Sequence, residues 1–315
     1  TNITHEHLDF HGTVENYRAA KGTLFAKVAE ARTIGKRGVV VVNVDDEGAR
    51  SIVPQAKGCR VISTSCANAA GADVTVMDVH SDPGGSSFTL VTPHGEAVVR
   101  LHLPGRYNVA NALSAAGAGI AIGLRPDQIA TGIESLRSVP GRMEAVDQGQ
   151  PFGVIVDYAH TPEAIRSVLL EARLLAANRV LVLFGSAGER DLEKRAVQGA
   201  VAIEQADYSI FTTEDPRFED PDRIIADIAL GAERAGGTRG VDFECIEDRR
   251  EAVAAILRAA EPGDVVVLAG KGHERSIIYE ADKRPWNESE VARELLRDLG
   301  WNHDSLHHPS RSANE

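Results

Sequence analysis

Short apolar runs alternate with amphipathic stretches along the second half of the chain. Runs rich in Val, Ile and Leu occupy 152–159, 178–185, 206–213, 241–246 and 264–272. The stretches 162–177, 191–205, 221–235 and 248–260, which lie between these runs, have the pattern of helices. Continuous apolar strands separated by helices are typical of a mostly parallel sheet covered on both faces. This half is therefore predicted to be a doubly wound α/β domain.

The first half has a mixed pattern. Residues 37–46 and 59–65 are predicted to form parallel strands, and 108–123 a helix of small residues that packs closely on a neighbour. The stretch 73–103 alternates in polarity and breaks at "DPGG" and "PHGE", which is typical of an antiparallel insert. A border near Ser138 divides the chain into domains 1–138 and 139–301, and 302–315 is expected to be a disordered tail.

Composition excludes several classes of protein. The chain has 315 residues and a net charge of −12, so no basic excess is available to neutralise nucleic-acid phosphates. Its three cysteines form neither a disulfide framework nor a metal cluster, which fits a reducing cytoplasm. No apolar stretch approaches the ~20 residues of a membrane span. We therefore expect a cytoplasmic protein that binds neither nucleic acid nor membrane.

Polar groups follow four of the predicted strands. They are Asp157, the loop "GSAGER" (185–190), "EDPR" (214–217) and "GKGHE" (270–274). Ligands of open α/β sheets bind at the carboxyl ends of the strands, so these groups are predicted to meet on one rim. The segment "FTTEDPRFEDP" places four acids and one arginine, Arg217, within eleven residues, which indicates a binding site for a molecule that carries both charges.

Two of these loops carry candidates with competing explanations. Thr161 to Glu163 form a good start for a helix, with an N-cap, a proline and an acid. Asp157 and His160 are not needed for that cap and are candidate functional residues. The Gly-rich loop can expose N–H groups to an anion, and its Arg190 is either part of that site or a solvated charge.

A lysine falls on the apolar stripe of the first predicted helix, which begins after Thr13. The residues that share its face are Val14, Tyr17, Leu24 and Val28. Lys21 either lays its stem along the apolar surface or is paired, neutralised or modified, because an unpaired buried charge is costly. Before it, His5, His7, Asp9 and His11 alternate on one side of an extended segment, which suits zinc or a hard cation that holds a phosphate.

Five stretches taken together resemble the Mur ligases, and among them the MurE type. These are "TNITHEHLDFHGTVENYRAAK", "LPGRYNVANALSAAG", "VPGRMEAVDQGQPFGVIVDYAHTP", "EDPRFEDP" and "AGKGHE". The resemblance covers roughly residues 1–300 and implies the fold: a partial central ATPase domain with an antiparallel insert, followed by a Rossmann-like doubly wound C-terminal domain.

The resemblance also implies an activity. Members couple ATP cleavage, with Mg²⁺, to amide formation through an acyl-phosphate that the amine of an amino acid displaces. The expected substrates are UDP-N-acetylmuramoyl-L-alanyl-D-glutamate and a diamino acid, with meso-diaminopimelate favoured over L-lysine or L-ornithine. The protein is expected to be a monomer that serves peptidoglycan synthesis, and hence cell wall biogenesis, cell shape and cell division.

The resemblance assigns roles to individual residues. His7 matches a magnesium-binding histidine, and Lys21 matches a lysine whose carbamate supports magnesium. The residues assigned to the nucleotide are Asn108 and Asn111 beside the adenine, and Arg142 and Asp157, with which His160 is grouped. The residues assigned to the amino acid are Arg190, Glu214, Asp215, Pro216, Arg217, Gly270 and Glu274. Arg217 is expected to bind a distal carboxylate, and the three acids among them are expected to accept from an ammonium group.

Two departures from the family pattern modify these expectations. The diaminopimelate branch usually has Asp-Asn-Pro-Arg where this chain has Glu214-Asp215-Pro216-Arg217, so an added carboxylate leaves the choice of amino acid open. A Gly-Lys-Ser/Thr phosphate loop is absent from the 315 residues, so the chain as given resembles a ligase without its front part and is predicted to be inactive. The alternatives are a ligase for another acceptor, against which "EDPR" and "GKGHE" argue, and a non-catalytic pseudo-ligase that binds a nucleotide or a partner.

Overall fold

The computed structural model describes residues 1–3, 11–36 and 38–302. His5, His7 and Asp9, and all but the first residue of the expected tail, lie outside these ranges. The chain forms two compact units. The first comprises 1–81, 86–102 and 106–137, and the second comprises 82–85, 103–105 and the chain from Ser138 onward.

The first unit is built on a five-stranded sheet in the order β1-β2-β3-β4-β5. Its strands are β1 (Val39–Asn43), β2 (Arg60–Ser65), β3 (Val74–Asp82), β4 (Gly85–Thr92) and β5 (Gly95–Leu101). The first two are parallel and the last two antiparallel, as predicted. The start of β3 pairs in parallel with β2, so the insert continues the parallel sheet rather than standing apart from it.

Helices of this unit are α2 (Val14–Thr33), α3 (Glu47–Ser51), α4 (Arg106–Ala121) and α5 (Pro126–Glu134), with a short 3₁₀ turn η1 (Val53–Gln55). The predicted close packing of the small-residue helix is confirmed. A side-chain carbon added at Gly117 of α4 would lie 2.6 Å from Val41 of β1, so the helix approaches the sheet where only glycine fits.

The predicted apolar stripe on α2 is only partly buried. Thr13 caps the helix as expected, its hydroxyl accepting from the N–H of Asn16. Tyr17 and Gly22 are the buried residues, and a side-chain carbon at Gly22 would lie 2.2 Å from Oε1 of Gln55 in η1. The helix therefore packs through its glycine side, which leaves Leu24 63% exposed and Lys21 exposed as well.

The second unit confirms the predicted doubly wound domain. Its six-stranded sheet has the order β10-β9-β8-β11-β7-β6. The strands are β6 (Glu144–Ala145), β7 (Gly153–Val156), β8 (Val180–Phe184), β9 (Tyr208–Phe211), β10 (Phe243–Cys245) and β11 (Val265–Leu268). All are parallel to their neighbours except β6, which pairs antiparallel with β7 at the edge.

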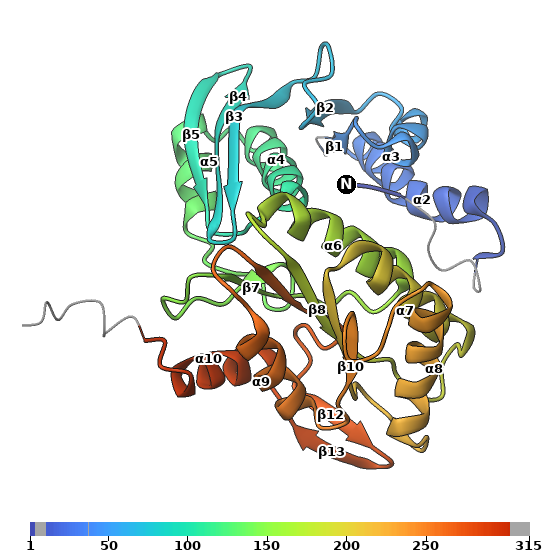
Figure 1. The fold of residues 1–315 in the computed structure, drawn as a ribbon. Helices are drawn as coiled ribbons and strands as arrows, with labels where there is room; N and C mark the ends of the chain where they lie inside the picture. The colour runs from blue at the N-terminus through green and yellow to red at the C-terminus, as the bar shows by residue number, and fades with distance from the viewer. Residues whose placement is uncertain (4–10, 37, 303–315) are drawn as a thin grey trace, which may run out of the picture. The chain divides into compact units, whose positions relative to one another are not determined.

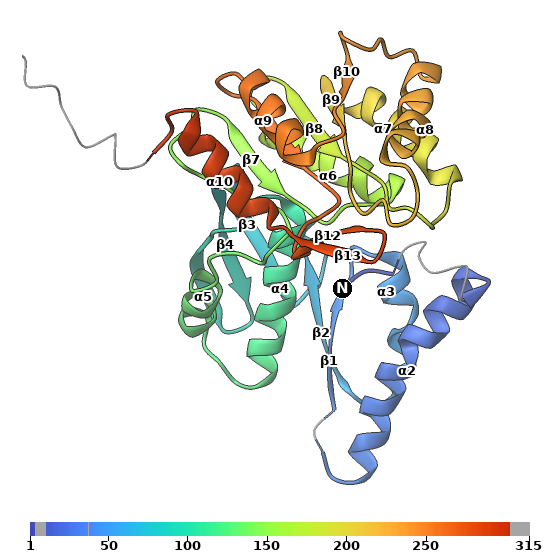
Figure 2. The same cartoon turned by 90° about the horizontal axis from the view of Figure 1, so that it is seen from below.

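Helices cover both faces of this sheet (Figures 1 and 2). They are α6 (Pro162–Leu175), α7 (Glu193–Gln205), α8 (Pro221–Arg234), α9 (Arg249–Ala259) and α10 (Glu288–Asp298). The central strand β8 shows why its sequence is apolar throughout. Val180, Val182 and Phe184 join the core beneath α6, α7 and α8, while Leu181 and Leu183 join the core beneath α9 and α10.

A two-stranded hairpin, β12 (Ser276–Tyr279) and β13 (Asp282–Pro285), completes the unit. The sequence pattern did not predict it, because every residue of β13 is exposed and no alternation marks the strand. Among the residues that the structure describes, none of the helices is long and apolar enough to cross a membrane.

Candidate functional site

The four polar loops predicted to share a rim do come together in the second unit. They follow β7, β8, β9 and β11, which run parallel and so end at the same edge. A side-chain carbon at Gly185 would lie 2.3 Å from the carbonyl oxygen of Thr212, and one at Gly270 would lie 3.0 Å from Oε2 of Glu214. The N–H of Gly188 donates to the carbonyl of Asp215 at 2.8 Å. Glycine at these positions lets the backbones of neighbouring loops touch.

Arg217 is fixed to this rim through its backbone. Its φ is 54°, a left-handed conformation that costs a non-glycine residue energy. The conformation is held because its N–H donates to the carbonyl of Ile278 in β12 (3.0 Å) and its carbonyl accepts from the N–H of Glu280, which directly follows β12 (2.6 Å). The side chain is half-buried, and its buried Nε has no hydrogen-bond partner among the described residues. A guanidinium with unused donors at a fixed place is suited to a carboxylate.

Lys271, a buried lysine that the sequence did not predict as a site residue, forms ion pairs with two of the predicted acids, Asp215 and Glu274. Lys271 is fully buried, and its Nζ donates to Oδ1 of Asp215 at 2.8 Å and to Oε2 of Glu274 at 2.6 Å. The expectation assigned both carboxylates to a substrate ammonium, and in this structure an internal ammonium takes that place. Its only sequence signal is position, a lysine three residues after the end of a fully buried strand.

Glu214 is buried on the same rim. Burial raises its pKa to about 7, and the nearby cations of Lys194, Arg249 and Lys271 oppose that rise. Its Oε2 has no hydrogen-bond partner among the described residues. Burial in turn lowers the pKa of Lys194, while the carboxylate of Glu214 raises it. The two groups therefore share one poorly solvated environment.

The carboxylate of Asp157 is hydrogen-bonded to backbone groups of its own loop and of the "PGRM" loop. It accepts from the N–H of Met143 at 2.8 Å and from that of Ala159 at 2.9 Å. Burial raises its pKa, and the two backbone hydrogen bonds counteract the rise. Beside it, the exposed guanidinium of Arg142 lies 5.2 Å from the ring centroid of Tyr158. Asp157 thus positions the "PGRM" loop that carries Arg142.

The other predicted rim residues have different exposures. The ring of His160 lies 4.7 Å from that of Tyr158, and its Nδ1 hydrogen-bonds the Tyr158 carbonyl at 2.9 Å. Arg190 is exposed at the end of the Gly-rich loop, whereas Pro216 and Gly270 are buried. His160 and Arg190 keep side-chain atoms accessible, and the other two shape the backbone.

The candidates of the first unit are less defined. Asn108 is buried in α4, and the side-chain amide of the exposed Asn111 donates to it at 3.5 Å. The Nζ of Lys21 lies 5.2 Å from the ring centroid of Tyr17. His7 lies outside the described residues. Within the described ranges, His, Cys, Asp and Glu form no group of three or more that could hold a metal ion.

Arg249 ties two of the rim loops together. This side chain is 2% exposed and donates to the carbonyls of Thr213 (3.0 Å) and Ala269 (2.9 Å) and to the buried carboxylate of Glu288. The sequence carried no signal for it, because its partners lie 20 to 39 positions away.

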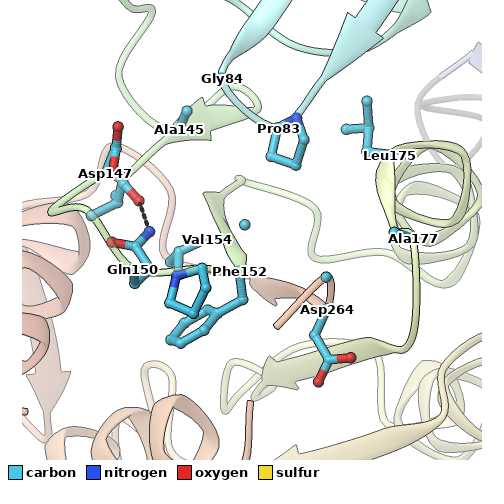
Figure 3. A pocket seen from close by; sticks show the side chains of 14 residues that line it. Pro83, Gly84, Ala145, Asp147, Gln150, Phe152, Val154, Leu175, Ala177 and Asp264 are labelled. Atoms are coloured by element: carbon cyan, nitrogen blue, oxygen red, sulfur yellow. Dashed lines mark hydrogen bonds between the residues drawn. The ribbon is translucent and has the colours of Figure 1, made fainter. Parts of the chain in front are cut away.

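A cavity of about 410 Å³ lies at the opposite ends of the strands. Gly153 and Asp264, at the amino ends of β7 and β11, contribute to it, together with Pro83 and Phe152 (Figure 3). The lining is largely apolar or backbone, and none of the predicted site residues belongs to it.

Comparisons with known proteins agree with this architecture. The family description "Mur ligase middle domain" matches residues 1–119, and "Mur ligase, glutamate ligase domain" matches residues 141–272. The chain belongs to the Mur ligase family and carries residues of its middle and C-terminal domains.

Several relatives of known name are similar over nearly all of the chain. It is 45% identical to a UDP-N-acetylmuramyl-tripeptide synthetase of Roseiflexus sp. (strain RS-1), over 96% of the chain and 60% of the relative. It is 38% identical to a UDP-N-acetylmuramoyl-L-alanyl-D-glutamate--2,6-diaminopimelate ligase of Geobacillus kaustophilus (strain HTA426), over 95% of the chain and 60% of the relative. The chain thus spans about 60% of the length of these relatives.

Solved structures share the fold. A structure of a UDP-N-acetylmuramoyl-L-alanyl-D-glutamate--2,6-diaminopimelate ligase is 30% identical, with a TM-score of 0.65 over 98% of this chain and 60% of that one. MurF from Acinetobacter baumannii is 21% identical with a TM-score of 0.63, over 95% of this chain and 58% of that one, which is a likeness of fold.

Proposed function

We propose that this chain forms part of an ATP-dependent ligase of peptidoglycan synthesis. The ligase joins an amino acid, meso-diaminopimelate, to UDP-N-acetylmuramoyl-L-alanyl-D-glutamate in the cytoplasm. The family membership supports amide-bond formation, and the names of several relatives include this muramoyl dipeptide and 2,6-diaminopimelate. The Roseiflexus relative is named for a tripeptide without stating its third amino acid, so the choice of amino acid depends on the rim itself.

The observation that carries the proposal is the position of Arg217 on the rim. Its backbone is bonded to the β12 hairpin on both sides, and its buried Nε lacks a partner among the described residues. meso-Diaminopimelate has a carboxylate at its distal end, whereas lysine and ornithine have only an ammonium there. A site that is built for a hydrogen-bonding group discriminates strongly against a ligand that lacks it, by as much as ~10⁴-fold.

The nucleotide and its metal are assigned to other residues of the two units. In the second unit, the exposed guanidinium of Arg142, held above Tyr158 by the loop that Asp157 anchors, fits a contact with a ribose or a phosphate. In the first unit, Asn108 and Asn111 sit one turn apart on α4, which suits the adenine. Bound Mg²⁺ would neutralise phosphate charge during phosphoryl transfer. Lys21, as its carbamate, and His7 are proposed to support the metal.

The test is amino-acid-dependent phosphate release by the full-length protein with Mg-ATP and the muramoyl dipeptide. We expect meso-diaminopimelate to have the highest kcat/KM, and Arg217→Ala to lower that value about a hundredfold or more, because one partner of a charged contact is lost. The control is Arg284→Ala, an exposed arginine of β13 that stacks on Tyr279. It is expected to stay within about twofold of wild type, since exposed charges contribute little. If lysine or ornithine is preferred and Arg217→Ala leaves that preference unchanged, the proposed contact between Arg217 and a distal carboxylate is wrong.

A further inference from the structure

Lys271 is a buried cation that forms two ion pairs within the second unit. It follows β11, is 0% exposed, and its ammonium lies 2.8 Å from a carboxylate oxygen of Asp215 and 2.6 Å from one of Glu274. A buried ammonium is tolerated only when opposite charges and hydrogen bonds replace the lost water. Two carboxylates do so here, so the buried position of Lys271 is a built-in part of this fold.

The two carboxylates differ in what else they do. Oδ1 of Asp215 also accepts from the N–H of Ile278 at 2.9 Å, which joins the "EDPR" loop to β12. The side chain of Glu274 is 34% exposed, so this carboxylate lies between the buried ammonium and the open rim. A ligand that binds at the rim therefore meets two acids whose negative charge the lysine has already partly offset.

We propose that Lys271 determines which amino acid the site accepts, acting as a specificity-determining positioning residue. Its ammonium donates to both Asp215 and Glu274 and offsets one of their two negative charges, so less anionic charge is left for a substrate whose distal group is only an ammonium. Arg190 and Arg217 then remain available to bind a distal carboxylate. The inference rests on the proposed function, because it concerns the same amino-acid site.

The charges on the rim show why one lysine has this effect. Arg190, Arg217 and Lys271 are the cations of the proposed amino-acid site, and Asp215 and Glu274 are the two acids paired with Lys271, which gives these five groups a net charge of one positive. A purely cationic side chain is repelled by such a site, whereas the neutral zwitterionic end of meso-diaminopimelate brings a carboxylate to the arginines. Without the Lys271 charge the rim is neutral, and two carboxylates are available for the ammonium of lysine.

The same reasoning explains why this chain has Asp215 where the diaminopimelate branch usually has asparagine. The second acid of "EDPR", Asp215, favours a cationic amino acid only if its carboxylate is free to bind the substrate. With Lys271 bound to it, Asp215 adds no free negative charge to the rim. The acid and the buried lysine therefore act as a matched pair.

The experiment measures the ratio of kcat/KM for L-lysine to kcat/KM for meso-diaminopimelate in the full-length protein. Lys271→Met is expected to raise this ratio at least about tenfold, the effect of removing one charge at pocket distance. Lys271→Met combined with Asp215→Asn removes one acid as well and is expected to return the ratio toward wild type. Lys283→Met, at an exposed lysine of β13, is the matched control and is expected to leave the ratio unchanged.

A role in folding alone would lower both rates without moving the ratio. If the ratio in Lys271→Met stays within twofold of wild type, the inference is overturned. If that variant does not fold, Asp215→Asn with Lys271 intact replaces it. The rim then gains positive charge and lysine use must fall further, and a rise would refute the inference. Dissociation constants of the two amino acids, measured by calorimetry on the same variants, give the ratio without turnover. A protein without ligase activity whose binding ratio still shifts would thus refute the proposed function and leave this inference standing.

Discussion

Arg249→Met tests whether one buried cation holds two loops of the rim. Arg249 donates to Glu288 through Nε and one terminal nitrogen at 2.9 Å each, and to the carbonyls of Thr213 and Ala269 at 3.0 and 2.9 Å. Glu288 is 0% exposed. Without its partner this carboxylate keeps the indole N–H of Trp286 as a donor, and both carbonyls lose a charged one.

The expected cost follows from these contacts. Breaking a buried ion pair by removing one partner costs about 3–5 kcal/mol. The two carbonyls add to the loss, although such contributions are not additive. A domain is stable by only about 5–15 kcal/mol, so Arg249→Met is expected to lower the free energy of unfolding of the second unit by roughly a third or more.

The chain offers a clean assay and a neighbouring control. Its two tryptophans, Trp286 and Trp301, both belong to the second unit, so tryptophan fluorescence during urea unfolding reports on that unit. Arg250→Met removes the adjacent arginine, which pairs with Glu294 at a similar 3.0 Å while both side chains are about half exposed. That variant is expected to lose less than about 1 kcal/mol. If the two variants lose equal stability, the argument from burial fails.

Two further predictions concern the same rim and use the same fluorescence assay. The pKa of Glu214 is raised from 4.5 to about 7, so the folded state retains a proton that the unfolded state loses, and stability falls as pH rises between these values. Glu214→Gln is expected to flatten this dependence and to raise stability at pH 8 by ~1–3 kcal/mol, and an unchanged pH slope would contradict the assignment. Gly141 has a φ of 64°, and a side-chain carbon there would lie 2.2 Å from the backbone nitrogen of His273. Gly141→Ala is expected to cost more than about 3 kcal/mol, against about 1 kcal/mol for Gly236→Ala, whose φ is also positive but whose surroundings are open, and similar costs would show that backbone conformation alone matters.

The sequence by itself determined the architecture of the second unit and the place of its rim. Apolar strands such as 180–184 have no polar residue to face water, so they must be buried on both sides between helices. Parallel strands end at one edge, so the order of strands and helices along the chain is enough to predict that Asp157, Glu214 and Gly270 share a rim. Local rules of this kind depend on spacing and side-chain type, and both can be read along the chain.

Only the tertiary structure decided which charges on that rim are already paired. Lys271 and Asp215 lie 56 positions apart, and Arg249 and Glu288 lie 39 apart, so no local pattern connects them. The exposure of Lys21 was decided in the same way, because a helical stripe shows which side chains share a face but not whether another segment covers that face. Ion pairs and burial depend on contacts between distant segments, and in this protein those contacts decide which charged groups remain available to a ligand.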